Sequence, residues 1–105
     1  MRIINYLTIS LLPKPNYLQV FVLKMKIEEF KYLEKEKKKR LLFDNGVYLA
    51  TRQESDFIIE LYQIDSFYVE AYLHESDNEV GYMRAFSSID ELLPYIGKID
   101  ISSLL

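Results

Sequence analysis

The chain has 105 residues, half of them apolar and 28% charged, which is enough for one folded domain and too few for two. These proportions exclude a disordered, a collagen-like and a multi-span membrane protein. The sequence has no cysteine and a single histidine, His74, which excludes disulfides, thiolate metal sites, cysteine nucleophiles and sites built on several histidines. We therefore expect a protein that is not an enzyme and that holds no cofactor and no metal.

Charge is distributed unevenly along the chain. The formal net charge is −3, but residues 1–24 contain three bases and no acid, and residues 25–46 contain seven bases and five acids. Residues 47–105 contain three bases and eleven acids. Because lysine and arginine supply most of the affinity for phosphate backbones, the acidic half disfavours a nucleic-acid partner, and any such binding would have to come from the basic segment before it.

Residues 1–24 form an apolar and basic segment that we expect to be an extension of the domain. Its apolar runs are broken by Pro13-Lys14-Pro15 and are shorter than the roughly twenty residues that span a membrane. No small-residue cleavage site follows, so we expect no secretory signal, no membrane partner and a cytoplasmic location. Met25 stands directly before a helix start, and a start of translation there would make residues 1–24 foreign to the native protein. Residues 25–105 then form a single α+β domain.

A helix is predicted over Lys26–Asp44, with apolar residues at three- and four-residue spacing and acids in its first turn. Asn45-Gly46 predicts a left-handed stop after it. The basic run Lys35–Arg40 is typical of a solvent-exposed helix face. Its alternative interpretation is a surface for nucleic acid, which would make the protein a nucleic-acid-binding accessory protein.

After Gly46 the apolar period changes to two, which predicts an antiparallel meander with polar turns. The four predicted strands are Val47–Arg52, Phe57–Gln63, Phe67–His74 and Val80–Phe86. In the last hairpin, the register that pairs Glu70 with Arg84 brings opposite charges together, which favours it over a slip of one residue. It also pairs Tyr72 with Tyr82 and Tyr68 with Phe86. The register between the second and third strands stays open, and one option sets Glu60 opposite Glu70.

The alternation places tyrosines, arginines and glutamates on the sheet face opposite the apolar core. We call this predicted surface the tyrosine face, and its members are Tyr48, Arg52, Glu60, Tyr62, Tyr68, Glu70, Tyr72, Tyr82 and Arg84. Tyrosine and arginine are the residue types that protein interfaces favour. Two interpretations stay open: the N-terminal arm or helix covers this face within the monomer, or two copies meet there as an isologous homodimer. We predict a small protein-interaction module that self-associates through this face.

The segment after the strands predicts a second helix. Ser88-Ile89-Asp90-Glu91 has the pattern of a capping box, Pro94 must kink the helix, and Gly97 ends it. The predicted fold class is therefore α+β: an N-terminal helix, a four-stranded antiparallel β-meander, and a C-terminal helix packed on the apolar sheet face.

Four short motifs of the second half carry a resemblance. They are Tyr68-Val69-Glu70, Phe86-Ser87-Ser88, Leu93-Pro94-Tyr95-Ile96 and Ile99-Asp100-Ile101-Ser102. Over residues 40–105 they resemble a group of short bacterial proteins of unassigned function. The resemblance implies a β-meander followed by a helix, and it implies no activity, cofactor or catalytic residue. In topology alone, four antiparallel strands before a helix are also similar to half of the PUR-alpha and whirly-type single-strand binders.

Overall fold

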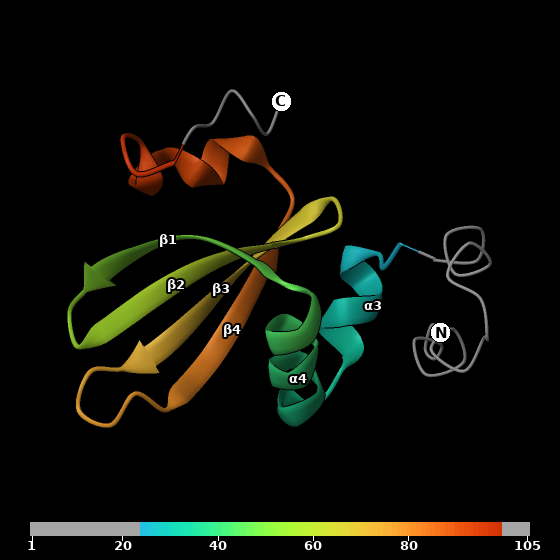
Figure 1. Ribbon diagram of the computed structural model, residues 1–105, viewed down its shortest axis with the longest axis horizontal. Coiled ribbons are helices and arrows are strands. Elements are labelled where there is room, and N and C mark those ends of the chain that lie inside the picture. Colours follow the sequence, from blue (N-terminus) through green and yellow to red (C-terminus); the bar gives the residue numbers. More distant parts are fainter. Residues whose placement is uncertain (1–23, 100–105) are drawn as a thin grey trace.

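The computed structural model describes residues 24–99, which form one four-stranded antiparallel sheet with short helices before and after it (Figure 1). The elements are α3 (Ile27–Tyr32), α4 (Lys35–Asn45), β1 (Val47–Glu54), β2 (Phe57–Ile64), β3 (Phe67–His74), β4 (Val80–Phe86) and the 3-10 helix η1 (Ile89–Tyr95). Strand order follows chain order, which confirms the α+β class and the meander. The predicted extension, residues 1–24, lies outside the described residues except for Lys24.

The sheet has a core on each of its two sides. On one, the helix side, Phe30 of α3 and Leu42 of α4 pack against Phe67 and Val69. On the other, the η1 side, Leu92 packs with strand residues of β1, β2 and β3. The prediction that the C-terminal helix covers the apolar face is therefore wrong, because η1 covers the side that bears the tyrosines of β3.

The helix predicted over Lys26–Asp44 is two helices, separated at Leu33 by extended backbone with ψ 151°. A continuous helix would hold Phe30 and Leu41 about 16 Å apart along its axis, since the rise is about 1.5 Å per residue. The break lets both side chains join one cluster on the sheet. Among residues 24–99, no helix has the length and apolar character needed to cross a membrane.

Gly46 follows α4 with a φ of −74°, so the predicted left-handed stop is wrong. The glycine is needed for a different reason, which is the close approach of its backbone to the end of the helix. Its N–H donates to the carbonyl oxygen of Leu42 at 2.9 Å, and a Cβ at this position would lie 2.6 Å from that oxygen. A side chain here must therefore push α4 away from β1.

We expect Gly46→Ala to lower the free energy of unfolding by about 1–3 kcal/mol, the usual cost of forcing an extra carbon into a packed site. The atom in the way is a backbone oxygen, which cannot swing aside as a flexible side chain would. Urea denaturation of both proteins measures the difference. An unchanged midpoint would mean that the junction of α4 with β1 is loose.

The last hairpin pairs as predicted except at its turn end, where the register shifts between Tyr72 and Leu73. Glu70 lies opposite Arg84 and Tyr72 opposite Tyr82, and Tyr68 pairs with Phe86. The tyrosine rings of the middle pair stack with centroids 4.3 Å apart. Both strands have the predicted bounds. Charge pairing and ring stacking were therefore sufficient to determine this register.

β2 presents the opposite faces from those predicted. Glu60 lies opposite Ala71, and Leu61 lies opposite Glu70. The cause is the turn after β2, which has two residues because Ile64 pairs with Phe67, whereas the prediction allowed three. A slip of one residue moves every side chain of a strand to the other face. Glu60 and Tyr62 therefore lie on the helix side of the sheet.

Tyr48 also changes side, through a different irregularity. The register of β1 with β2 shifts between Tyr48 and Ala50, so Leu49 forms a bulge. Tyr48 consequently pairs with Tyr62 on the helix side, and Val47, predicted on the apolar core face, pairs with Gln63 on the η1 side. β1 keeps the predicted arrangement from Ala50 to Arg52.

The C-terminal helix is a 3-10 helix of seven residues. The Ser88 hydroxyl oxygen accepts a hydrogen bond from the Asp90 N–H, as expected of an N-cap. The Glu91 carboxylate accepts from Arg84, so the second hydrogen bond of the predicted capping box is replaced by this contact. Pro94 has no N–H to donate to a helical hydrogen bond. Both features favour a short tight turn over an α-helix.

Candidate functional site

The structure divides the predicted tyrosine face between the two sides of the sheet. Six of its nine residues lie on the η1 side: Arg52, Tyr68, Glu70, Tyr72, Tyr82 and Arg84. The other three lie on the helix side: Tyr48, Glu60 and Tyr62. The prediction of a single surface is therefore wrong, and each side has to be considered separately.

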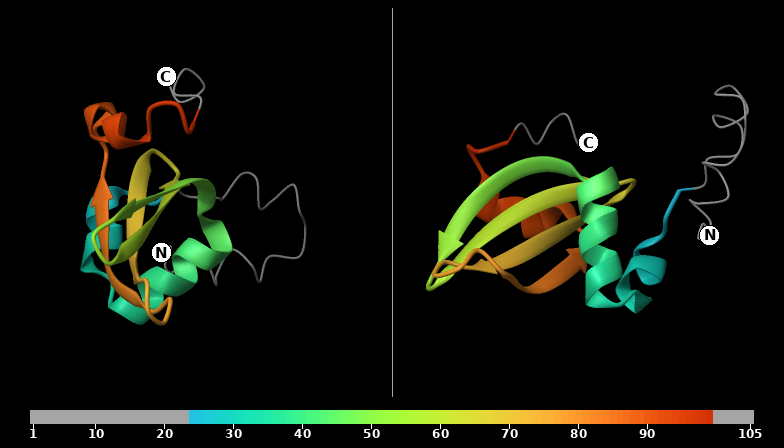
Figure 2. Two further views of the ribbon diagram at one scale, coloured as in Figure 1. Left: turned by 90° about the vertical axis from the view of Figure 1, so that its left-hand side faces the viewer. Right: turned by 60° about the horizontal axis from the view of Figure 1, so that its bottom comes forward.

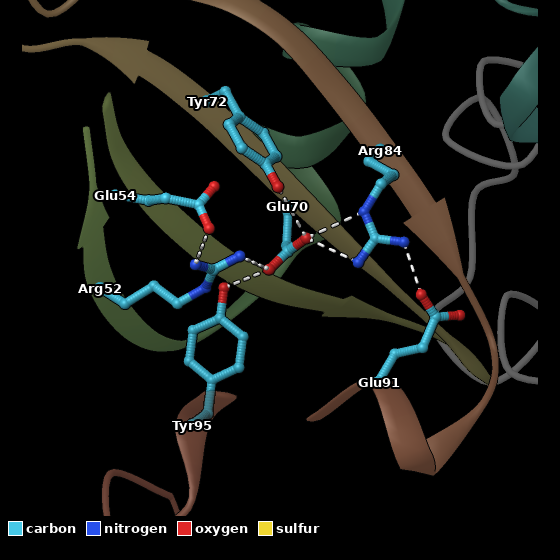
Figure 3. Close-up of polar contacts among 7 residues, drawn as sticks. All are labelled: Arg52, Glu54, Glu70, Tyr72, Arg84, Glu91 and Tyr95. Carbon is cyan, nitrogen blue, oxygen red and sulfur yellow. Dashed lines mark hydrogen bonds and ion pairs between the residues drawn. The ribbon is translucent and has the colours of Figure 1, made fainter. Parts of the chain in front are cut away.

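Glu70 is the centre of the η1 side, and its side chain is fully buried (Figure 3). One carboxylate oxygen accepts from Arg84 Nη2 at 2.9 Å and Nε at 3.1 Å, and from the Tyr72 hydroxyl at 3.4 Å. The other accepts from Arg52 Nη2 at 3.2 Å and from the Tyr95 hydroxyl at 2.5 Å. We call these five residues the Glu70 network.

The network keeps its charges in the ionised form. Burial by itself would raise the pKa of Glu70, but the hydrogen bonds from Tyr95, Arg84 and Arg52 outweigh it and hold that pKa below its ordinary value. Burial raises the pKa of Tyr95, and its bond to the carboxylate raises it further. The hydroxyl therefore stays protonated and continues to donate.

The Glu70 carboxylate has no capacity left for chemistry. Five donors occupy a group with about four lone-pair sites, so none is free to take a proton from a substrate or to hold a metal. Arg84 also forms an ion pair with Glu91 of η1, and this second contact is structural as well. The network therefore fastens η1 to the sheet.

The remaining rings of the η1 side are packed within the monomer. Phe86 lies against Tyr68, which is buried beneath η1. Phe57 meets Tyr72 and Tyr82 edge-on at the other end of the sheet. Tyr68 is thus covered by η1, and the predicted cover by the N-terminal helix is wrong, because α3 and α4 pack on the other side of the sheet. The N-terminal arm lies outside the described residues.

A groove of about 430 Å³ opens on the helix side, between α4 and the strands of the sheet. Its α4 wall includes Lys39 and Phe43, and its floor comes from all four strands. The strand residues include Tyr48, Glu60, Tyr62, Leu73 and Met83. The groove thus joins apolar and aromatic side chains with one base and one acid.

Hydrogen bonds hold the tyrosines of the groove in place. The Tyr62 hydroxyl donates to Glu60 at 2.6 Å, and the Tyr48 and Thr51 hydroxyls are 2.6 Å apart. Burial raises the pKa of Tyr62, and the bond to the Glu60 carboxylate raises it further. The two tyrosine rings meet edge-on with centroids 5.9 Å apart. The floor is therefore pre-organised at this end.

Large apolar side chains at the groove are exposed. Phe43 is 90% exposed and Tyr48 is 56% exposed, and both line it. Apolar groups gathered at a concave surface are typical of a binding site for another molecule.

We compared the chain with protein-family models, with curated proteins and with solved structures. None of them matches. The resemblance to short bacterial proteins therefore stays a prediction, and the two sides must be interpreted from their geometry. Among the described residues, no group of three or more histidine and acidic side chains is placed to hold a metal ion. The basic run Lys35–Arg40 lies on α4, and its role with nucleic acid also stays a prediction.

The sequence analysis missed several residues of both sides. Tyr95 joins the Glu70 network from η1, and Glu91 of the same helix bonds to Arg84 of the network. No strand alternation can reveal either contact. Phe43 had a usable signal. It follows Leu41 and Leu42, and three consecutive apolar residues cannot all face inward on one amphipathic helix. One of them had to be exposed.

Proposed function

We propose that this protein is a small, non-enzymatic, cytoplasmic protein-interaction module that binds a protein partner in the helix-side groove. The observation that carries the proposal is the exposure of Phe43 and Tyr48 on a groove whose floor is already built. Groups that are exposed and apolar contribute to affinity once a partner covers them, because their burial removes apolar area from water.

The composition of the groove supports a protein partner. Tyrosine contributes a large contact area at low entropic cost and keeps a hydroxyl for hydrogen bonding. Lys39 and Glu60 supply one charge of each sign at the groove, which can orient a peptide segment. The η1 side offers less, because its carboxylate and most of its rings already have partners within the chain.

Site-specific photocrosslinking tests this proposal. A benzoylphenylalanine in place of Phe43 keeps the ring and reports what lies within a few ångströms of it. The matched control replaces Tyr32 of α3, which is also an exposed aromatic residue and lies outside the groove. We expect protein adducts in cells from position 43 and not from position 32. Equal adducts from both positions, or no adduct from position 43, would contradict the proposal.

A further inference from the structure

We propose that the partner in the groove is a second copy of this chain, placed face to face about a two-fold axis. In this dimer, α4 of each copy lies over the groove and the acidic turns of the other. The inference rests on the proposed function, because it names the occupant of the same groove. It follows from the way in which charge is divided between the two ends of the molecule.

One end of the sheet is acidic. The turn after β1 and the turn after β3 lie at the same end, since Phe57 pairs with both Glu54 and His74 (Figure 2). This end contains no lysine or arginine in either turn. Its exposed acids are Glu54, Asp56, Glu75, Asp77 and Glu79. We call them the acidic turns.

The other end is basic. α4 contains five bases and two acids, and its buried leucines pack with Ile64 and Phe67, which mark the end of the sheet opposite the acidic turns. Lys37 and Arg40 are exposed on α4. The groove lies between this helix and the acidic turns, because Leu73 and Val80 line it beside the turn after β3.

A two-fold arrangement buries the apolar groups of both grooves and also brings charges of opposite sign together. With the grooves facing each other in antiparallel orientation, Phe43 of each copy meets the groove of the other, and each basic helix meets the partner's acidic turns. A parallel arrangement would place like charges together. A head-to-tail contact would pair charges but would leave one groove empty in every pair. The antiparallel dimer is therefore the arrangement that the surface favours.

A complementary charge exchange tests the dimer. The helix variant carries Lys35→Glu, Lys37→Glu and Arg40→Glu, which changes the net charge of α4 from +3 to −3. The turn variant carries Asp56→Lys, Glu75→Lys and Glu79→Lys, which changes the net charge of the acidic turns from −5 to +1. All six side chains are exposed, so the fold should be preserved, and circular dichroism checks this. Sedimentation and native mass spectrometry measure the species formed by each variant alone and by their equimolar mixture.

We expect the unaltered chain to dimerise, with a dissociation constant that rises about tenfold or more between low and high salt. Each variant alone should be monomeric, because its helix and its partner's turns then carry the same sign. The mixture should form a heterodimer, in which both contacts again join opposite charges. Neither apolar aggregation nor misfolding would produce this pattern.

A monomer at all concentrations, dimers that persist in both variants, a mixture that stays monomeric, or filaments in place of dimers would each overturn the inference. The proposed function has a separate test. If the chain is monomeric while position 43 crosslinks to a different protein, the inference is wrong and the proposed function holds. If position 43 yields no adduct at all, both are wrong.

Discussion

Replacing Glu70 with glutamine should lower the free energy of unfolding by about 3 kcal/mol, which urea denaturation measures. Removing one member of a buried ion pair leaves the other charges without compensation, and such losses cost about 3–5 kcal/mol. We expect the lower end of this range because the Arg84 side chain is 41% exposed to water and keeps its ion pair with Glu91. The cost remains large because the Arg52 side chain is only 15% exposed. The amide would also direct N–H donors toward groups that already donate.

The loss should depend on pH in a defined direction. The pKa of Glu70 lies below its ordinary value of 4.5 in the folded chain, so its contribution is complete above that value and disappears as the pH falls through the folded pKa. The difference between the two proteins should therefore be constant near neutral pH and shrink in acid. Glu79→Gln, in an exposed turn, is the control and should change stability by less than about 0.5 kcal/mol. Equal losses in both variants would show that the network does not fasten η1.

Replacing Leu92 with alanine should cost about 2–5 kcal/mol, the range for large-to-small changes in a packed core. Leu92 is fully buried between η1 and the sheet, and it packs with Phe86, Tyr68 and Tyr95. The deletion leaves a cavity at the contact that holds η1 in place. Denaturation monitored by tyrosine fluorescence measures the loss.

The next residue supplies a matched control. Leu93 is 63% exposed in the same helix, so Leu93→Ala removes the same atoms and should change stability by less than about 0.5 kcal/mol. If both substitutions lowered the free energy of unfolding by the same amount, the claim that Leu92 packs η1 on the sheet would be wrong.

The pairing of β3 with β4 could be predicted from the sequence. Whether the turn after β2 has an even or an odd number of residues could not. The β3–β4 register follows from cross-strand chemistry, because Glu70 needs Arg84 and Tyr72 needs Tyr82. The register of β2 depended on whether Ile64 belongs to a strand or to a turn, and its side chain suits both. A difference of one residue in the length of this turn moves every side chain of β2 to the other face of the sheet. It moved Glu60 and Tyr62 to the helix side.

Tertiary contacts decided the features that sequence periodicity missed. The break at Leu33 has no strong local signal, since the gain comes from bringing Phe30 and Leu41 to one cluster. The Glu70 network joins β1, β3, β4 and η1, so it required a register and a docked helix before it could be recognised. The residues of the predicted tyrosine face were informative, but the prediction of one shared surface was wrong.

The central claim is that the helix side of the sheet, and not the η1 side, binds the partner. Backbone amide NMR shifts over a series of protein concentrations from micromolar to millimolar test it most directly. The account predicts concentration-dependent shifts at Phe43, Leu73 and Met83 in the groove, and constant shifts at Tyr68 and Leu92. Shifts that move on the η1 side while the groove stays constant would contradict it.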